Sequence, residues 1–329
     1  MGFLETVISA PRSKPRRRGL TMVLDRLAGD PRPIVEALAP YIDVVKIGWG
    51  IPVLLEDAIL ARRVSLYRDH DVHVSNGGTL LELAVAKGRH RKALEGFVRA
   101  WFDTVELSEG VIDIPARVQR EIVEFVRSKG LRLHWEVGRK SVHHQLSLEE
   151  TIVRAQRALD FRPETVIIEG RESGKGVEIY DDAGAIKWDW VDRLRAAVPP
   201  DPLMFETPLE IQQTEMVLRL GPDVNLGNIA FSSVAALETQ REGLRGDTFG
   251  VVAPLPQTVV SPAGKFVYHI LRTQGVLDQG RIMELTGLNR RTVQYALDAL
   301  VSARAVRVGK DSRDLRRRLY ECVPNVPAS

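Results

Sequence analysis

Between residues 19 and 242, eight short apolar runs alternate with eight longer amphipathic stretches. The runs are rich in Val, Ile and Leu and predict strands, whereas the stretches between them have the period of amphipathic helices. Several runs are almost continuously apolar, which is typical of parallel strands that helices cover. Eight strand–helix units in roughly 235 residues predict an α/β fold, a closed (β/α)8 TIM barrel rather than an open doubly wound sheet.

The predicted strands and helices follow one another without interruption. The strands cover residues 20–25, 42–48, 72–75, 103–108, 131–138, 165–170, 203–207 and 223–228. The helices lie near residues 31–40, 54–68, 80–100, 114–128, 148–160, 186–197, 208–220 and 231–242. A dinucleotide-binding sheet would need a GxGxxG loop after the first strand, and this chain has Asp25, Arg26 and Leu27 there instead.

The formal net charge of +3 is distributed unevenly along the 329 residues. From residue 255 onward there are 12 Lys and Arg against 6 Asp and Glu, whereas the first 254 residues hold 34 basic and 37 acidic ones. An acidic body with a basic appendage indicates a body that acts on a small molecule and an appendage that meets a polyanion.

The sequence changes character after residue 250. Residues 251–262 contain three prolines and no charge, and we interpret them as a linker. Helical patterns at about 263–273, 278–286 and 290–302, followed by a predicted hairpin at 305–323, have the order of a winged helix-turn-helix domain. We therefore expect an N-terminal segment (1–18), the barrel (19–250), the linker (251–262) and a small winged helix-turn-helix domain (263–329).

Basic residues of the expected C-terminal domain lie where such domains contact double-stranded DNA. Asn289, Arg290 and Arg291 would begin the recognition helix, whose first turn contacts the major groove. Arginines of the hairpin would contact phosphates and make the affinity salt-dependent. They are Arg313, Arg316, Arg317 and Arg318. Winged helices also serve dimerisation and protein docking, and a charged run is often only a solvated face, so these alternatives stay open.

The single cysteine, Cys322, excludes an intramolecular disulfide and favours a reducing compartment. No apolar run approaches the roughly 20 residues that a membrane span needs. The short apolar stretch at the N-terminus precedes its basic cluster, the reverse of a secretory signal. We expect a cytoplasmic protein without a membrane partner, and a homo-oligomer.

Nearly every predicted strand ends in a polar or charged residue, and in a TIM barrel the active site lies at these ends. A single strand-end carboxylate often only caps the following helix, but eight such ends at one mouth are hard to explain as caps. The set comprises Asp25, Lys46, Gly77, Gly78, Thr79, Glu106, Ser108, Glu136, Lys140, Glu169, Arg171, Glu172, Ser173, Glu206, Asn225 and Asn228. Acids among lysines and arginines are typical of a divalent cation, most simply Mg²⁺, that holds an anionic substrate.

The chain has only 10 lysines against 36 arginines, and Lys46 and Lys140 lie at strand ends. Burial can lower the pKa of a lysine until it releases a proton near neutrality, which a guanidinium cannot do. The two lysines are therefore candidate catalytic residues. The alternative is that each only forms a salt bridge with a neighbouring carboxylate.

Two glycine-rich segments are candidate phosphate sites. Gly77, Gly78 and Thr79 open a predicted helix, whose first N–H groups are free to bind an anion. Residues 172–176 (ESGKG) offer a second loop with Ser173 and Lys175. Glycine pairs also simply turn the chain, so neither segment is specific alone.

Segments spread over residues 19–250 share a pattern with a known enzyme family. They read, in order, GLTMVLD, YIDVVKIGWG, NGGTLLE, VELSEG, EVGRK, VIIEGRESGKG, FETP and NLGNIAF…LETQREGLRGDTFG. Together they resemble the phosphosulfolactate synthases, and EGRESGKG and LRGDTFG are the most specific of them. The resemblance implies a (β/α)8 barrel that adds sulfite to phosphoenolpyruvate with Mg²⁺, giving (2R)-phospho-3-sulfolactate on a route towards coenzyme M or sulfolactate.

The resemblance also implies roles for the strand-end residues. Sulfite would attack C3 of phosphoenolpyruvate, and Lys140, in the family's EVGKK-like motif, would protonate C2. Lys46, Arg171 and Lys175 would bind carboxylate, phosphate or sulfite, and Mg²⁺ would stabilise the charge that develops on the carboxylate. The candidate metal ligands are Glu106, Glu136, Glu169 and Glu206.

Three segments depart from the family pattern near the mouth. Asn76 stands where the family has Pro before the two glycines, Thr207 follows Glu206 where the family has Ala, and the last helix reads LETQRE rather than a more basic run. Two alternatives therefore stay open. One is an enzyme of the same fold with a different nucleophile or acceptor, and the other is a transcriptional regulator whose barrel senses a phosphorylated or sulfonated ligand.

Overall fold

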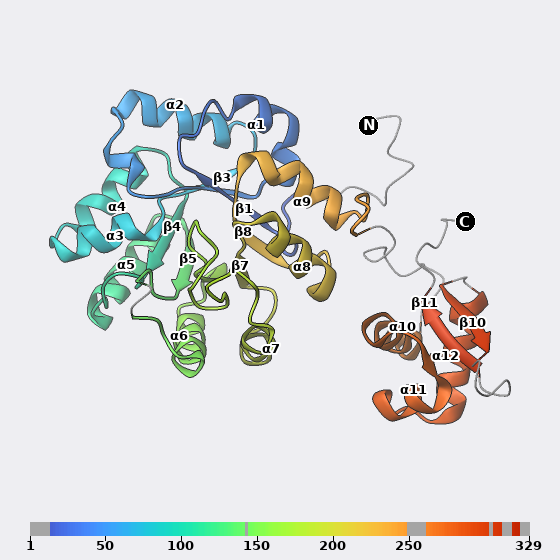
Figure 1. The fold of residues 1–329 in the computed structure, drawn as a ribbon. Coiled ribbons are helices and arrows are strands. Elements are labelled where there is room, and N and C mark those ends of the chain that lie inside the picture. Colours follow the sequence, from blue (N-terminus) through green and yellow to red (C-terminus); the bar gives the residue numbers. More distant parts are fainter. Residues whose placement is uncertain (1–13, 142–143, 249–260, 303–304, 311–317, 323–329) are drawn as a thin grey trace. The chain divides into compact units, whose positions relative to one another are not determined.

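The computed structural model describes residues 14–141, 144–248, 261–302, 305–310 and 318–322. The chain divides into two compact units, a barrel and a smaller C-terminal unit. Figure 1 shows the strands of the barrel at its centre and the helices around them. Among the described residues, every helix is too short or too polar to span a membrane.

Eight parallel strands close into a barrel in sequence order, which confirms the predicted TIM barrel. They are β1 (Thr21–Asp25), β2 (Val44–Ile47), β3 (His73–Ser75), β4 (Thr104–Ser108), β5 (Arg132–Val137), β6 (Thr165–Ile168), β7 (Leu203–Glu206) and β8 (Asn225–Ile229). The closing pair, β1 with β8, is parallel like the others. The strands are buried almost throughout, because their inner faces fill the barrel and the helices cover their outer faces.

Helices connect successive strands and cover the barrel. They are α1 (Arg32–Leu38), α2 (Asp57–Arg68), α3 (Gly78–Ala86), α4 (His90–Arg99), α5 (Ala116–Ser128), α6 (Leu148–Asp160), α7 (Trp188–Ala197), α8 (Glu210–Leu220) and α9 (Val234–Arg241). The single helix expected at 80–100 is wrong, since two helices occupy this range. Gly88 lies between them with φ +63°, a left-handed conformation that ends α3 and that glycine adopts at little cost.

Alternation along the strands decides which side chains reach the mouth. Met22, Val44, Ile167 and Met204 form an apolar cluster from four strands and fill the barrel interior. Side chains two positions apart on a strand face the same way. The residues two positions further along these strands are Leu24, Lys46, Glu169 and Glu206. The polar residues at the mouth of the barrel therefore lie directly above the apolar cluster that fills its interior.

The C-terminal unit consists of three helices and a small antiparallel sheet. The helices are α10 (Pro262–Gln274), α11 (Gln279–Thr286) and α12 (Arg290–Ser302), and the strands are β9 (Leu277–Asp278), β10 (Val306–Lys310) and β11 (Arg318–Cys322). β11 pairs with both β10 and β9, a third strand that the sequence did not predict. Val267, Leu271 and Leu297 belong to the core of this unit.

Several predicted features lie outside the described residues. They are most of the linker, at residues 251–260, and the hairpin tip with Arg313, Arg316 and Arg317. Arg318 is described, opens β11 and is exposed.

Candidate active site

A pocket of about 150 Å³ lies at the carboxyl ends of the barrel strands. Its lining is Leu24, Lys46, Gly48, Trp49, Gly77, Gly78, Thr79, Glu106, Glu136, Lys140, Glu169, Arg171, Glu172, Glu206 and Asn228. The barrel topology thus brings together most of the strand-end residues that the sequence singled out.

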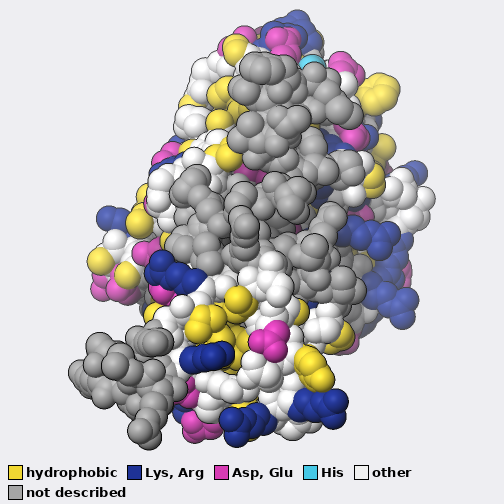
Figure 2. Space-filling view, turned by 90° about the vertical axis from the view of Figure 1, so that its right-hand side faces the viewer, with side chains coloured by type: hydrophobic (Ala, Val, Ile, Leu, Met, Phe, Trp, Pro, Cys, Tyr) yellow, Lys and Arg dark blue, Asp and Glu magenta, His cyan; other side chains and the backbone are white. Residues whose placement is uncertain are grey.

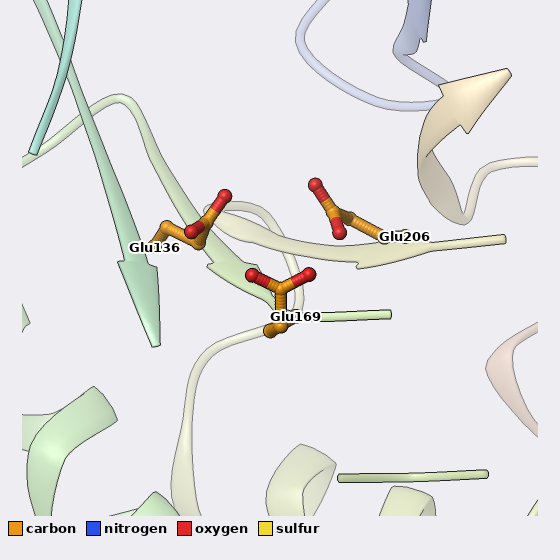
Figure 3. A group of neighbouring side chains, drawn as sticks. All are labelled: Glu136, Glu169 and Glu206. Carbon is orange, nitrogen blue, oxygen red and sulfur yellow. The ribbon is translucent and has the colours of Figure 1, made fainter. Parts of the chain in front are cut away.

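Four buried glutamates form the floor of the pocket. Glu136, Glu169 and Glu206 each offer a carboxylate oxygen within 4.8 Å of the others, and Figure 3 shows these carboxylates facing one another. Glu106 adds a fourth from β4, and its Oε1 accepts a hydrogen bond from the Gly78 N–H at 2.7 Å. Its Oε2 is buried and accepts no hydrogen bond within the described part of the chain.

Lys46 rises from β2 into the centre of these carboxylates. Its Nζ lies 2.6 Å from Glu206 Oε1, 3.2 Å from Glu136 Oε2 and 3.3 Å from Glu106 Oε2. Burial alone would lower the pKa of Lys46, but the carboxylates around it outweigh burial and hold that pKa well above its usual range.

Lys140 contacts the other side of the cluster. Its Nζ donates to Glu136 and, at 2.5 Å, to Glu169 Oε2. Burial would again lower the pKa of Lys140, and the charges of Glu136 and Glu169 raise it well above its usual range. Both lysines therefore carry a proton in this arrangement, and the expectation that burial lowers their pKa is wrong. The salt-bridge alternative describes the observed contacts.

The two lysines do not neutralise the four carboxylates. Burial raises the pKa of Glu106 to about 7, although Lys46 opposes the shift. Burial and the charge of Glu136 raise the pKa of Glu169 well above its usual range. Glu136 differs, because the two lysines outweigh its burial and keep its pKa low. Excess negative charge, together with an unsatisfied oxygen on Glu106, fits a divalent cation with carboxylate ligands.

The Gly77–Gly78–Thr79 segment forms one wall and begins α3. Gly77 has φ +68°, and a Cβ on Gly78 would lie 2.1 Å from Ser108 Oγ, so glycine is required at both positions. Ser108 lies behind this segment and donates to Glu82 Oε1 at 2.5 Å. The segment thus reaches the pocket with its backbone.

Five predicted substrate-binding residues do not line this pocket: Asp25, Ser108, Ser173, Lys175 and Asn225. Asp25 is buried and pairs with Arg63 at 2.5 Å and with the Tyr67 hydroxyl at 2.7 Å. Asn225 begins β8, at the opposite end of the barrel, and its Nδ2 donates to the carbonyl oxygens of Asp201 and Leu203.

The pocket also contains residues that the sequence did not single out: Leu24, Gly48 and Trp49. Trp49 is 57% exposed and has a positive φ of 55°. A signal for it was present in the sequence, since an aromatic residue between two glycines directly follows the second strand. Asn228 Nδ2 donates to the Arg171 carbonyl oxygen at 3.3 Å.

The predicted DNA-binding residues that are described lie at the start of α12 and on β11. Asn289 caps the helix, since its Oδ1 accepts from the Thr292 N–H at 2.9 Å. Arg290 and Arg291 are exposed, and the Arg291 guanidinium lies over the ring of Tyr295, 5.6 Å from its centroid.

Comparison with known proteins finds a family model and curated relatives that match the barrel. The model of the (2R)-phospho-3-sulfolactate synthase (ComA) family matches residues 10–247. The phosphosulfolactate synthase of Methanocaldococcus jannaschii is 38% identical over 242 residues, which are 72% of this chain and 96% of that protein. That of Methanothermobacter thermautotrophicus is 38% identical over 251 residues, 74% of this chain and 97% of that protein. That of Bacillus subtilis is 31% identical over 244 residues, which are 72% of this chain and 94% of that protein.

Proposed function

Because this chain belongs to the phosphosulfolactate synthase family, whose members are lyase-type enzymes, we propose that its barrel adds sulfite to phosphoenolpyruvate and yields (2R)-phospho-3-sulfolactate. The observation that carries the proposal is the buried cluster of four glutamates and two lysines at the mouth of the barrel. Such a cluster, once it holds a divalent cation, suits a small anionic substrate whose charge changes during the reaction.

The reaction forms one bond from sulfur to carbon and one from hydrogen to carbon. The sulfite sulfur attacks C3, the double bond of the enol phosphate is lost, and its electrons move towards the carboxylate. Lys140 then delivers a proton to C2: its raised pKa keeps the ammonium group protonated, and two carboxylates fix its position. Arg171, the Gly77–Thr79 backbone and Lys175 would hold the anionic groups of the substrates.

We propose Mg²⁺ as the cofactor of this site. Glu136, Glu169 and Glu206 would hold it, with Glu106 as the fourth candidate ligand. When bound, the cation supplies positive charge beside the substrate carboxylate, where negative charge builds up. Without a cation, the four carboxylates would repel phosphoenolpyruvate.

Phosphorus NMR tests the proposed reaction. The full chain, incubated with phosphoenolpyruvate, sulfite and Mg²⁺, should convert the enol phosphate signal into that of an alkyl phosphate ester. Omitting sulfite is the control and should leave the signal unchanged. Absence of a new ester would contradict sulfite addition, and an ester formed without sulfite would show another nucleophile.

We also propose that the C-terminal unit is a winged helix-turn-helix domain that binds double-stranded DNA. Arg290 and Arg291 are exposed on the first turn of α12, and Tyr295, 62% exposed, continues the same face. Figure 2 shows one face of the molecule, on which Lys and Arg side chains stand among apolar, acidic and uncharged ones. Basic groups at the start of a helix suit the major groove and its phosphates.

Fluorescence anisotropy with a labelled duplex tests DNA binding. The Arg290→Ala/Arg291→Ala double variant should bind at least about tenfold more weakly at low salt, with a smaller salt dependence. The matched control is Arg193→Ala/Arg195→Ala, which removes the same charge from α7 of the barrel. Equal affinity of the two variants, or no binding by the unchanged chain, would favour a docking module.

A further inference from the structure

Trp49 stands at the rim of the pocket in a conformation that does not favour stability. It lines the pocket, is 57% exposed and has φ +55°, a left-handed conformation that is strained for a residue with a side chain. Because the indole is largely exposed, it contributes only a small part of the hydrophobic stabilisation that a buried tryptophan gives. Strain and exposure together are typical of functional positions.

The backbone on both sides holds the indole at this rim. A Cβ on Gly48 would lie 2.7 Å from Leu24 Cδ1, so the end of β2 lies directly against β1. Gly50 has φ +68° and turns the chain away after Trp49. The ring is therefore placed by the adjoining strand ends.

Arg26, from the loop after β1, lies over this ring. Its guanidinium carbon is 5.4 Å from the Trp49 ring centroid, within the range of a cation–π interaction. Within the described parts of the chain Arg26 forms no ion pair, whereas Lys46, Lys140 and Arg171 each contact a carboxylate. Arg26 does not itself line the pocket but lies beside Trp49, as a cation without an ion pair among the described residues.

The charge of the pocket leaves a role for this cation. Five glutamates line the pocket against two lysines and one arginine. A divalent cation held by the glutamates would only balance this excess, so the charge of the two bound anions, phosphoenolpyruvate and sulfite, still calls for a further cation. A guanidinium donates in a fork that matches the oxygens of such a group.

We propose that Arg26 and Trp49 form the outer anion subsite of the pocket, with Arg26 binding a group of three negatively charged oxygens and the Trp49 ring holding the guanidinium in place. The subsite rests on the proposed function, and its ligand is either the phosphate group of phosphoenolpyruvate or the sulfite. Both present the same chemistry of three oxygens with negative charge.

Steady-state kinetics of Arg26→Ala distinguish the two sources. The KM of one substrate should rise by about tenfold, as expected for loss of a charged hydrogen bond, and this rise should exceed any fall in kcat. A higher KM for phosphoenolpyruvate identifies the phosphate, and a higher KM for sulfite identifies the nucleophile. Arg117→Ala, which removes an exposed arginine on α5, is the control and should match the unchanged chain. Unchanged KM values for both substrates would overturn the subsite while leaving the sulfite reaction intact.

Tryptophan fluorescence supplies a measurement that needs no turnover. Inorganic phosphate and sulfite, titrated separately, should change the emission of the unchanged chain in a saturable way for at least one anion. Trp49→Phe should lose this change, and Arg26→Ala should shift its midpoint about tenfold higher. These results without any product would support the subsite and contradict the sulfite reaction. A change that Trp49→Phe retains, or no change with either anion, would overturn the subsite.

Discussion

Lys140 joins its proposed catalytic role to a structural one, because its ammonium group bridges Glu136 and Glu169. Removing the side chain would leave these buried carboxylates without their partner, so alanine confounds the two roles. Arginine keeps the charge but cannot release a proton near neutral pH.

Lys140→Arg should therefore fold and lose at least about 100-fold in turnover, the usual contribution of a positioned proton donor. Phosphorus NMR gives the rate, and circular dichroism checks the fold. Lys92→Arg, an exposed change on α4, is the control. Turnover close to that of the control would remove Lys140 as the proton donor.

Glu178 is a buried carboxyl beside the pocket wall. Its Oε1 accepts from the Arg139 N–H at 3.1 Å and its Oε2 from the Thr151 hydroxyl at 2.9 Å. Burial raises its pKa from 4.5 to about 7, so the folded chain holds a proton that the unfolded chain releases within this window. The folded state therefore loses stability as pH rises from about 4.5 to 7.

Glu178→Gln removes this titration and should become more stable relative to the unchanged chain as pH rises. The gain across the window should be on the order of 2–3 kcal/mol in the free energy of unfolding. Urea denaturation without added metal, at pH 5 and pH 8, measures it. If the free energies of unfolding of the variant and the unchanged chain differ by the same amount at both pH values, Glu178 is not a buried, protonated carboxyl.

At the scale of elements, Glu82 connects α3 to the loop after β4. Its carboxylate accepts from the N–H groups of Gly110, Val111 and Ile112 and from Ser108 Oγ. The Lys140 N–H in turn donates to the Gly110 carbonyl oxygen at 2.9 Å. The glutamate thus fixes a loop against which the proposed proton donor is placed.

Glu82→Gln replaces one accepting oxygen by an NH₂ group that cannot accept. In either orientation of the amide at least one backbone N–H group loses its acceptor, which should lower the free energy of unfolding by about 1–3 kcal/mol. Chemical denaturation measures the loss, with the exposed Glu95→Gln on α4 as control. A loss no larger than the control's would show that the loop does not depend on Glu82.

The order of strands and helices was predictable because apolar periodicity is a local property of the sequence. Two features could not be predicted from local periodicity. Gly88 interrupts an apolar pattern that continues on both sides of it, and β9 has only two residues, too few to form a recognisable pattern. Strand-end position predicted Glu136, Glu169 and Glu206 as neighbours. Strand-end position also predicted that Asp25 binds substrate, whereas Asp25 pairs with Arg63 of α2. This pairing depends on the position of a helix in space and could not be predicted from the strand alone. The pKa direction of Lys46 also depended on spatial neighbours.

At the scale of the whole molecule, charge and chemistry are divided between two units. The first 254 residues are acidic on balance and the remainder is basic. The match to the enzyme family covers residues 10–247 and ends before α10 begins at Pro262. The proposed reaction and the proposed DNA binding therefore use separate residues.

The Arg290→Ala/Arg291→Ala variant should accordingly keep its turnover within about twofold of the unchanged chain, a difference of less than about 0.5 kcal/mol. The phosphorus NMR assay measures this in the same preparation used for DNA binding. A tenfold fall in turnover, with the fold intact, would show that the barrel depends on the C-terminal unit.

The central claim is that the glutamates at the mouth hold a divalent cation beside the substrate. Anomalous diffraction from crystals of the full chain grown with Mn²⁺ and phosphoenolpyruvate tests it most directly, since Mn²⁺ takes the same oxygen ligands as Mg²⁺. The account predicts one strong peak among the carboxylates of Glu136, Glu169 and Glu206, with substrate density next to it. Substrate bound in the pocket with no peak there, or a peak at a distant site only, would contradict it.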